Sequence, residues 1–411
     1  MALTLSRKAQ AVKPSSTLAI TAKAKELKAQ GLTSSSEAFL LAQGPEVLKR
    51  IQEPDFNTPD NICNAAIKAI KDGFTKYTPA SGIVELKQAV CDKFKKFNGL
   101  DYKPSQIVIS NGGKHSLTNV FEAILNPGDE VIIPAPYWLS YPEIIKLSDG
   151  VPVFVRGEKE NGYKVTAEQL QAATTEKTKA LVLNTPNNPT GMIYSEEELR
   201  AIADYAVKND IYVVSDEMYE YLVYNGNKHI SIASFNEEIY KRTITVSGLA
   251  KSYAMTGWRI GYTGSSEEIA KLMGSVQSHQ TSNPNSIAQK AALEALTGDQ
   301  STVQMMLGEF DKRRKFMYEK MSALPYVSTE EPLGAFYVFA DVSEALKKEY
   351  KGKKVETAAE FARILIEDYN VAVVPCADFG FPDHIRLSYA ISVEQIDKGL
   401  TRIEKFLNDL Q

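Results

Sequence analysis

Short apolar runs alternate with amphipathic helical patterns through the middle of the chain. One helical pattern, SEEELRAIADYAVKND, opens with Ser195 and Glu198 at the spacing of a capping box. Runs of strand length separated by helices indicate a parallel sheet covered by helices on both faces. Strands are expected in Ser105–Ser110, Gly128–Pro136, Lys179–Pro186, Asp210–Glu217, Arg242–Gly248 and Trp258–Gly264.

The pattern changes after about Gln304. The stretch MMLGEFDKRRKFMYEKMSAL predicts one long amphipathic helix, and three strand-like runs, GAFYVFADVS, VAVVPCADF and HIRLSYA, follow it. These features predict a second, smaller α+β domain, which the N-terminal helical pattern STLAITAKAKELKAQG joins. We therefore expect a large domain over residues 60–305 and a small domain built from residues 1–59 and 306–411.

Composition narrows the classes of function. The chain has 411 residues, of which 44% are hydrophobic and 24% charged, and its formal net charge is −4. This balance gives no electrostatic reason to expect nucleic acid or an anionic membrane as a partner. No run approaches the roughly 20 apolar residues of a membrane span. Three scattered cysteines and four scattered histidines predict no metal site and suit a reducing cytoplasm.

The predicted strand ends carry polar and aromatic groups. Asn111-Gly112-Gly113-Lys114 follows the first run and precedes a helix, so its backbone N–H groups can approach a phosphate. Trp138 follows the second run and can stack on a flat ring. The third run ends in the turn Asn184–Gly191, whose amides can donate to a ligand oxygen. Taken singly, these features are also typical of ordinary turns and core aromatics.

The fourth and fifth runs end in ionisable groups. Asp216 lies at the end of a buried strand, where a carboxylate needs a cation or strong donors, and Tyr219 follows it by one helical turn. Lys251 follows a short Ser/Gly turn, where partial burial lowers an amine's pKa, and Arg259 can clamp an anion. Together the five strand ends describe a ligand with a phosphate, a basic heteroaromatic ring with a phenolic oxygen, and an aldehyde. That ligand is pyridoxal 5′-phosphate.

Several longer motifs strengthen this interpretation. The stretches YTPASGIVELK, PYWLSYPE, NTPNNPTG, SDEMYE and SGLAKSYAMTGWRIGY occur in order along the chain. With them the sequence resembles the class I/II, fold-type I pyridoxal-phosphate aminotransferases, and among these the bacterial aspartate aminotransferases. The resemblance implies a mostly parallel seven-stranded sheet, and a homodimer with shared active sites.

The resemblance also implies roles for matching residues. Lys251 would hold the cofactor covalently and carry the proton, Asp216 would keep the pyridine nitrogen protonated, and Arg386 would bind the substrate's α-carboxylate, with Asn188 and Trp138 beside the substrate. Among the remaining cofactor contacts, Tyr219 and Asn188 would bind the phenolic oxygen and Trp138 would stack on the ring. The phosphate would be held by Gly113, Lys114, Ser247 and Arg259 of the same chain, and by Tyr77 contributed by the partner subunit.

The implied reaction is a ping-pong transfer of an amino group from an L-amino acid, with aspartate the best guess, to 2-oxoglutarate. Alternatives are an aromatic or prephenate aminotransferase, a pyridoxal-phosphate lyase, and a cofactor-binding variant with impaired turnover. The last follows from Ser34–Gln52, which is longer and more helix-like than in relatives and has Gln52 where they carry glycine. This segment is either a surface helical insertion or a replaced lid. A second departure is Gly248, three residues before Lys251, where some relatives carry a phosphate-binding serine.

Overall fold

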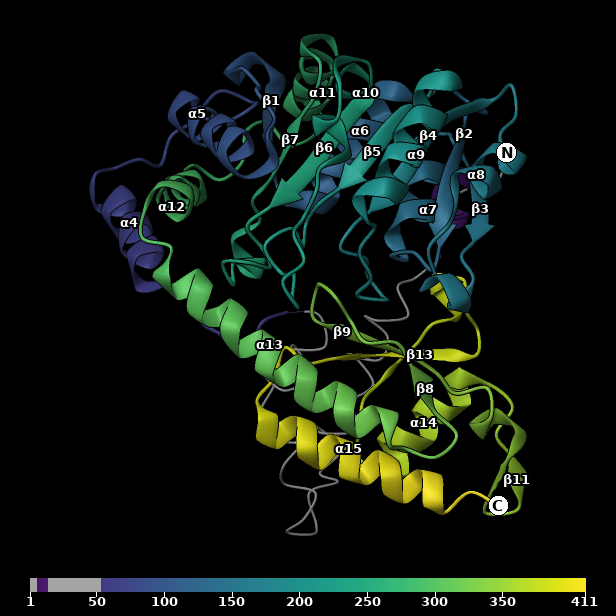
Figure 1. Ribbon diagram of the computed structural model, residues 1–411. Coiled ribbons are helices and arrows are strands. Elements are labelled where there is room, and N and C mark those ends of the chain that lie inside the picture. Colours follow the sequence, from purple (N-terminus) through teal and green to yellow (C-terminus); the bar gives the residue numbers. More distant parts are fainter. Residues whose placement is uncertain (1–5, 14–52) are drawn as a thin grey trace, which may run out of the picture.

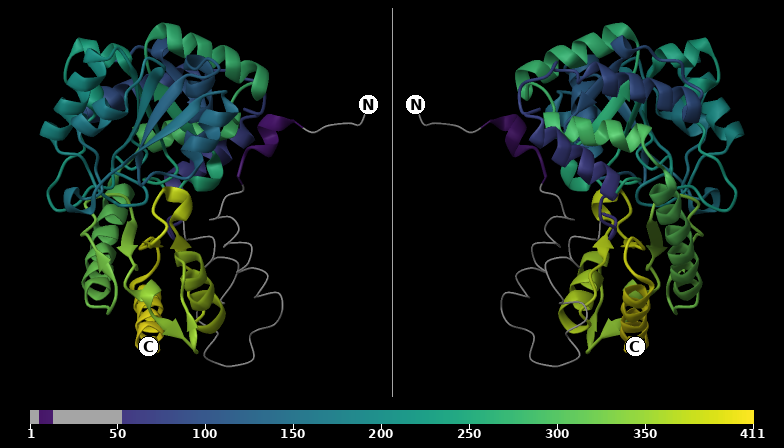
Figure 2. Two further views of the ribbon diagram at one scale, coloured as in Figure 1. Left: turned by 90° about the vertical axis from the view of Figure 1, so that its right-hand side faces the viewer. Right: turned by 90° about the vertical axis from the view of Figure 1, so that its left-hand side faces the viewer.

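The computed structural model describes residues 6–13 and 53–411. Figures 1 and 2 show a large part built on one sheet and a smaller part below it, with helix α13 (Ser301–Ser322) running from one to the other. The domain boundary expected at residue 305 falls inside this continuous helix. The expected N-terminal helix and the segment Ser34–Gln52 lie outside the described residues. Within 6–13 and 53–411, no helix combines the length and apolarity needed to cross a membrane.

The large sheet has seven strands in the order β1-β7-β6-β5-β4-β2-β3. Strands β3, β2, β4, β5 and β6 are parallel, and β7 runs antiparallel to both of its neighbours. This confirms the prediction of a mostly parallel sheet. The bounds are β1 Ile107–Ser110, β2 Glu130–Ala135, β3 Val151–Arg156, β4 Thr178–Asn184, β5 Tyr212–Asp216, β6 Thr243–Gly248 and β7 Gly261–Gly264.

Alternate residues of the central strands face opposite helical layers. In β4, Ala180 and Val182 pack with α6, α7 and α11, whereas Leu181 and Leu183 pack with α8, α9 and α10. Burial on both faces explains why these strands read as continuous apolar runs. The helices concerned are α6 Gly113–Ile124, α7 Ser140–Leu147, α8 Ala167–Ala173, α9 Glu196–Lys208, α10 Glu237–Arg242 and α11 Glu267–Gln280.

The capping box expected before α9 is present. The Glu198 N–H donates to Ser195 Oγ at 3.2 Å, and the Ser195 N–H donates to Glu198 Oε2 at 2.7 Å. Two N–H groups at the helix start are thereby satisfied, which fixes where α9 begins after the long polar turn. Three further helices, α4 (Asp60–Lys71), α5 (Val84–Lys93) and α12 (Ser286–Thr297), pack together beside β1, as Figure 1 shows.

The smaller part holds an antiparallel sheet in the order β12-β13-β9-β8. Helices α13, α14 and α15 cover it, and α13 packs against α15. Its elements are β8 Ser328–Thr329, β9 Tyr337–Asp341, β12 Val374–Pro375, β13 His384–Ser388, α14 Ala358–Asp368 and α15 Val393–Asn408, with the hairpin β10 Glu349–Tyr350 and β11 Lys353–Lys354.

One expected strand starts later than predicted. Trp258 lies in a 3₁₀ turn (Thr256–Trp258) and Arg259 has a φ of 57°, so β7 begins only at Gly261. The left-handed residue turns the chain so that Gly261 passes directly over the turn between β1 and α6. A Cβ at Gly261 would lie 2.4 Å from Gly113 N and 2.5 Å from Gly112 C. Because these neighbours are backbone atoms, only glycine fits here.

We therefore expect Gly261→Ala to lower the free energy of unfolding by about 1–3 kcal/mol, since the added methyl must push the β1–α6 turn aside. The matched control is Gly308→Ala in α13, where a Cβ meets nothing within 4 Å. That change should stabilise the helix by about 0.5–1 kcal/mol. Thermal unfolding of both variants measures the contrast, and equal melting temperatures would contradict the close approach.

Candidate active site

The candidate site lies at the carboxyl ends of β4, β5 and β6 and at the turn between β1 and α6. Ligands of open α/β sheets collect at this edge. Strand β13 adds Arg386 from the smaller part. The ends of β5 and β6 are held side by side, because Asp216 pairs with Val246 in the ladder and the Glu217 N–H donates to the Val246 carbonyl at 2.8 Å.

The β1–α6 turn forms a cradle for an anion. Gly112 has a φ of 91°, and α6 begins at Gly113, so the first N–H groups of the helix face this turn. The Arg259 guanidinium lies against it, since a Cβ at Gly112 would be 2.4 Å from Arg259 Nη2. Arg259 Nη1 donates to the Thr256 carbonyl at 2.9 Å. A guanidinium beside a helix N-terminus is a suitable arrangement for a phosphate group.

Asp216 is a buried carboxylate at the end of β5. Its Oδ2 accepts from the Tyr141 hydroxyl at 2.6 Å, and its Oδ1 accepts from the Met218 N–H at 3.1 Å. Burial raises the pKa of Asp216 to about 6, against the opposing effect of these two donors. Within the described residues it has no cationic partner. A ligand N–H⁺ at this carboxylate would compensate the burial.

Lys251 lies in the turn after β6 and is surrounded by other cations. Burial, followed by the charges of Arg386 and Arg259, lowers the pKa of Lys251 to about 8, while Glu53 opposes the shift. Its Nζ lies 5.5 Å from the centre of the Phe336 ring. An amine with a lowered pKa has a substantial neutral fraction near physiological pH, and only the neutral amine can attack a carbonyl.

Arg386 is buried beneath the same site. It is 2% exposed, and its Nη1 donates to Asn188 Oδ1 at 2.8 Å, while the guanidinium lies 4.4 Å from the centre of the Tyr337 ring. Nε and Nη2 have no hydrogen-bond partner within residues 6–13 and 53–411. Buried donors are costly to leave unpaired, so these two nitrogens are suited to a carboxylate in a bidentate fork.

Two further aromatic residues complete the site. The Tyr219 hydroxyl lies 2.9 Å from the Tyr337 hydroxyl, and burial raises the pKa of Tyr219 well above its ordinary value. Trp138 meets Tyr141 edge to face at 5.4 Å, and Lys114 Nζ lies 4.9 Å from the Trp138 ring centre. Burial, then Arg259, lowers the pKa of Lys114. The side chain of Lys114 therefore belongs to the site, whereas the sequence suggested only its backbone.

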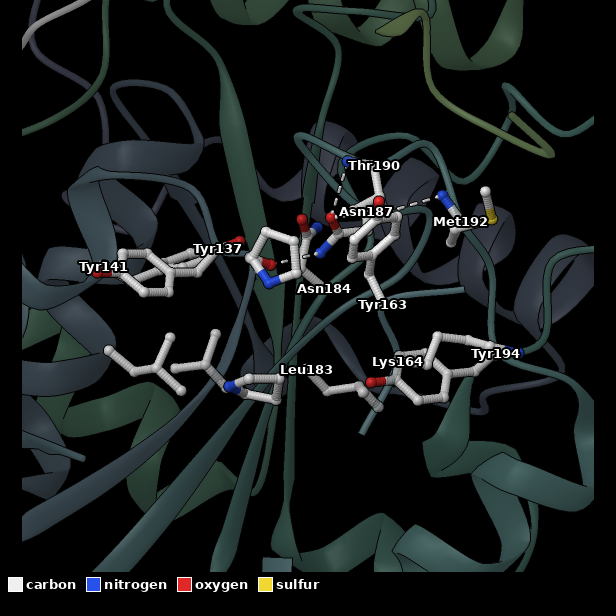
Figure 3. A pocket seen from close by; sticks show the side chains of 14 residues that line it. Tyr137, Tyr141, Tyr163, Lys164, Leu183, Asn184, Asn187, Thr190, Met192 and Tyr194 are labelled. Atoms are coloured by element: carbon white, nitrogen blue, oxygen red, sulfur yellow. Dashed lines mark hydrogen bonds between the residues drawn. The ribbon is translucent and has the colours of Figure 1, made fainter. Parts of the chain in front are cut away.

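The turn that presents Asn188 is braced from below. Asn187 Nδ2 donates to the Pro136 carbonyl at 3.4 Å and its Oδ1 accepts from the Thr190 N–H at 3.1 Å, as Figure 3 shows. The cavity between this turn and Tyr163 has a volume of about 20 Å³. A cavity of that size holds about one water molecule and is too small for a substrate. The residues around it support the turn that carries Asn188.

One predicted site residue, Ser247, is directed elsewhere, and Tyr77 is expected at the site of a partner subunit. Ser247 is fully buried, and its hydroxyl donates to Glu220 Oε1 at 2.5 Å. That hydroxyl proton is engaged by the Glu220 carboxylate and is not available to a phosphate. Tyr77 is 90% exposed, so within this chain its ring is largely uncovered. The structure thus brings together Gly113, Lys114, Trp138, Asn188, Asp216, Tyr219, Lys251, Arg259 and Arg386, but neither Ser247 nor Tyr77.

Two tyrosine hydroxyls and one cluster of ionisable groups near the site were not predicted from the sequence. Tyr141 donates to Asp216, and its i+3 spacing from Trp138 in PYWLSY was the available sign of a shared helical face. Tyr337 faces Tyr219 from β9. Glu217, Glu220 and His229 bring three possible ligand atoms within 4.8 Å of one another, although the sequence predicted no such cluster.

Comparison with known proteins agrees with this geometry. Residues 50–403 match the family model described as aminotransferase class I and II. The aspartate aminotransferase of Bacillus sp. (strain YM-2) is 48% identical, over 98% of this chain and 99% of that protein. The aspartate aminotransferase from Rhizobium meliloti superposes with a TM-score of 0.92 at 36% identity, over all of both chains. The aspartate aminotransferase from Thermus thermophilus with maleate gives 0.88 at 42% identity, over 98% and 100%.

The matches extend over the parts of the chain that carry each of the residues described above, including β13 with Arg386 and the turn with Lys251. The fold, the identity and the coverage lead to one conclusion: this chain belongs to the class I and II aminotransferase family.

Proposed function

We propose that the protein transfers the amino group of L-aspartate to 2-oxoglutarate with pyridoxal 5′-phosphate as cofactor. The observation that carries the proposal is the excess of positive charge at the site. Lys114 interacts with Arg259, and Lys251 interacts with both Arg259 and Arg386, while Asp216 is the buried acid among them. Neighbouring cations that lower the pKa of Lys114 and Lys251 are stabilised when the ligands between them are anionic. A phosphate and a dicarboxylate supply such charges.

The residues present fit pyridoxal 5′-phosphate. Arg259 and the start of α6 suit its phosphate, Asp216 suits its ring nitrogen, and the Lys251 amine suits its aldehyde. Trp138 supplies an aromatic surface for the ring. When bound, the cofactor acts as an electron sink for negative charge that develops at the substrate's α-carbon.

The chain's own groups then perform the remaining work. Without substrate, the Lys251 Nζ would hold the aldehyde carbon of the cofactor. Once the substrate amine takes that place, the released Nζ would be able to move a proton from the substrate's α-carbon. Asp216 keeps its negative charge beside the ring nitrogen, and Tyr141 holds that carboxylate in place. The Tyr219 hydroxyl, with its strongly raised pKa, stays protonated and donates a hydrogen bond.

The two ends of the substrate are assigned to two cations. Nε and Nη2 of Arg386 take the α-carboxylate, because they are buried guanidinium nitrogens without a hydrogen-bond partner among the described residues. Lys114 Nζ, held over Trp138, takes the second carboxylate. The Thermus thermophilus relative was solved with maleate, which is also a C4 dicarboxylate. A second cation in the site favours a dicarboxylic substrate such as aspartate over an aromatic amino acid.

We also propose that two copies of the chain form a dimer with shared sites. Tyr77 is 90% exposed, and Ile67, Ile70 and Val84 are 47%, 55% and 65% exposed on the same stretch of chain. Exposed apolar side chains gathered in this way are typical of a protein interface. A tyrosine that its own chain leaves uncovered can reach the phosphate site of a partner, as the family resemblance implies.

The first prediction concerns substrate choice. Aspartate with 2-oxoglutarate should yield glutamate, and Lys114→Ala should lower kcat/KM for aspartate about 10–100-fold through loss of a charged hydrogen bond. Alanine, which has no second carboxylate, is the control donor and should respond little. Steady-state assays of glutamate formation measure both. With cysteine, a donor that carries a β-leaving group, release of pyruvate and ammonia without glutamate would indicate a lyase. A cofactor spectrum unmoved by aspartate would indicate binding without turnover.

The second prediction concerns Lys251. In the cofactor-free protein the rate of covalent cofactor attachment should rise about tenfold per pH unit and level off above a midpoint of about 8, because the neutral amine is the reactive form. Stopped-flow absorbance gives the rate. Lys251→Ala should show no reducible covalent link by peptide mass spectrometry. A rate that still climbs steeply at about pH 10 would contradict the lowered pKa.

The third prediction tests the shared site. Chains carrying Lys251→Ala and chains carrying Tyr77→Ala, with different tags, are co-expressed and the hybrid dimer is purified. If Tyr77 acts across the interface, one site holds both defects and the other holds none, so the hybrid should keep roughly half of the wild-type kcat. If Tyr77 acts within its own chain, the hybrid is as inactive as its parents. Tyr326→Ala, at a tyrosine 38% exposed, is the control.

A further inference from the structure

The turn that carries Asp216 and Tyr219 has a second, opposite side. Asp216 and Tyr219 face the site, whereas Glu217 and Glu220 point into the protein and are 0% and 2% exposed. Two buried carboxylates in one short turn are unfavourable unless charges and donors compensate them. Their partners come from segments far apart in the sequence, so this turn is fixed by tertiary contacts.

Each carboxylate is fully provided with donors. Glu217 Oε1 accepts from Ser215 at 2.8 Å and Ser231 at 2.7 Å, and His229 Nε2 lies 2.8 Å from its Oε2. Asn98 Nδ2 donates to Glu217 Oε2 at 2.9 Å and to Glu220 Oε2 at 2.8 Å. The cluster resembles a metal site, but its oxygens are already engaged by these donors.

Lys93 supplies the positive charge where a metal ion would otherwise lie. It is the last residue of α5 and 7% exposed, and its Nζ forms an ion pair with Glu220 Oε1 and donates to Asn98 Oδ1 at 2.9 Å. Its Nζ also lies within 6 Å of four aromatic ring centres, which stabilise an ammonium over their faces. These rings belong to Phe94, Phe97, Tyr221 and Tyr262.

The cluster also reaches the segment that carries Lys251. Ser247 Oγ, the last polar side chain of β6, donates to the same Glu220 oxygen that pairs with Lys93. Four residues later the chain presents Lys251. Glu220 therefore ties the turn after β5 to the end of β6. Lys93, at the end of α5, and Asn98, in the turn that follows α5, bind the glutamates of the β5 turn.

We propose that Lys93, Glu220 and Ser247 are positioning residues for the transfer reaction: they hold Tyr219 and Lys251 in register with Asp216. This inference rests on the proposed function, because it assigns Lys251 as the attachment point. None of the three residues touches the substrate. Their effect passes through the backbone of the two turns that they join.

The primary test is Ser247→Ala, which removes the link to β6 but leaves the Lys93–Glu220 ion pair in place. We expect the melting temperature to be nearly unchanged. Attachment of pyridoxal 5′-phosphate to the cofactor-free protein should slow about tenfold or more, and kcat should fall by a similar factor. The KM for aspartate should stay within about twofold of the wild-type value. Inhibition of attachment by inorganic phosphate should be unchanged. Weakened phosphate inhibition would instead make Ser247 a phosphate ligand and overturn the proposal, as would unaltered attachment and kcat.

The second variant is Lys93→Met, with Arg314→Met as its matched control. Arg314 is a fully buried arginine paired with Asp311 and Glu331, away from the site. Both variants should melt at lower temperature, because Lys93→Met leaves the buried Glu220 without its cation and Arg314→Met leaves the Pro332 carbonyl without its buried donor. Assayed below both melting temperatures, only Lys93→Met should lose kcat and attachment rate, and equal kcat in the two would overturn the proposal. Failure of the wild-type protein to attach the cofactor would refute the proposed function instead.

Discussion

A carboxylate buried at the carboxyl end of a parallel strand governs the arrangement of this active site. Asp216 is taken out of water by the strands beside β5, and this burial raises its pKa to about 6. Hydrogen bonds from Tyr141 and the Met218 N–H compensate part of the cost. The part of the burial cost that these hydrogen bonds do not offset favours a cationic ligand nitrogen beside Asp216. A protonated heteroaromatic ring provides such a nitrogen.

Positive charge gathers at the site from three different parts of the fold. Lys114 comes from the start of α6, Lys251 and Arg259 from the connection between β6 and β7, and Arg386 from β13. Burial and the neighbouring arginines lower the pKa of Lys251 to about 8. Two buried nitrogens of Arg386 have no hydrogen-bond partner among the described residues. The clustered positive charge, which is costly to bury, is also what makes Lys251 reactive toward an aldehyde and Arg386 attractive to a carboxylate.

A buried polar cluster on the far side of the β5 turn holds the site residues of this turn in position. Glu217 and Glu220 turn inward as Asp216 and Tyr219 turn outward, and Lys93 balances the charge from α5. Satisfied buried networks are rigid because any movement breaks several hydrogen bonds at once. Catalytic geometry at this turn therefore depends on residues that the substrate never meets.

The sequence predicts most strands of the large sheet, although not β3, and it places candidate site residues at the strand ends. Apolar runs with helices between them predict the mostly parallel sheet, and the residues at the strand ends already include Asp216, Trp138 and Lys251, because ligands meet such sheets at that edge. Arg386 and Tyr77 came from the family resemblance alone. The start of β7 was misplaced, since the left-handed conformation of Arg259 is set by its packing beneath the β1–α6 turn. Tertiary structure alone directed Ser247 to Glu220, joined Tyr141 to Asp216 and gathered Lys93, Asn98 and His229 around the two glutamates. Periodicity records which face of an element is buried. The partner of a buried charge is chosen by contacts between separate segments, here 12 to 127 positions apart, and no local pattern encodes them.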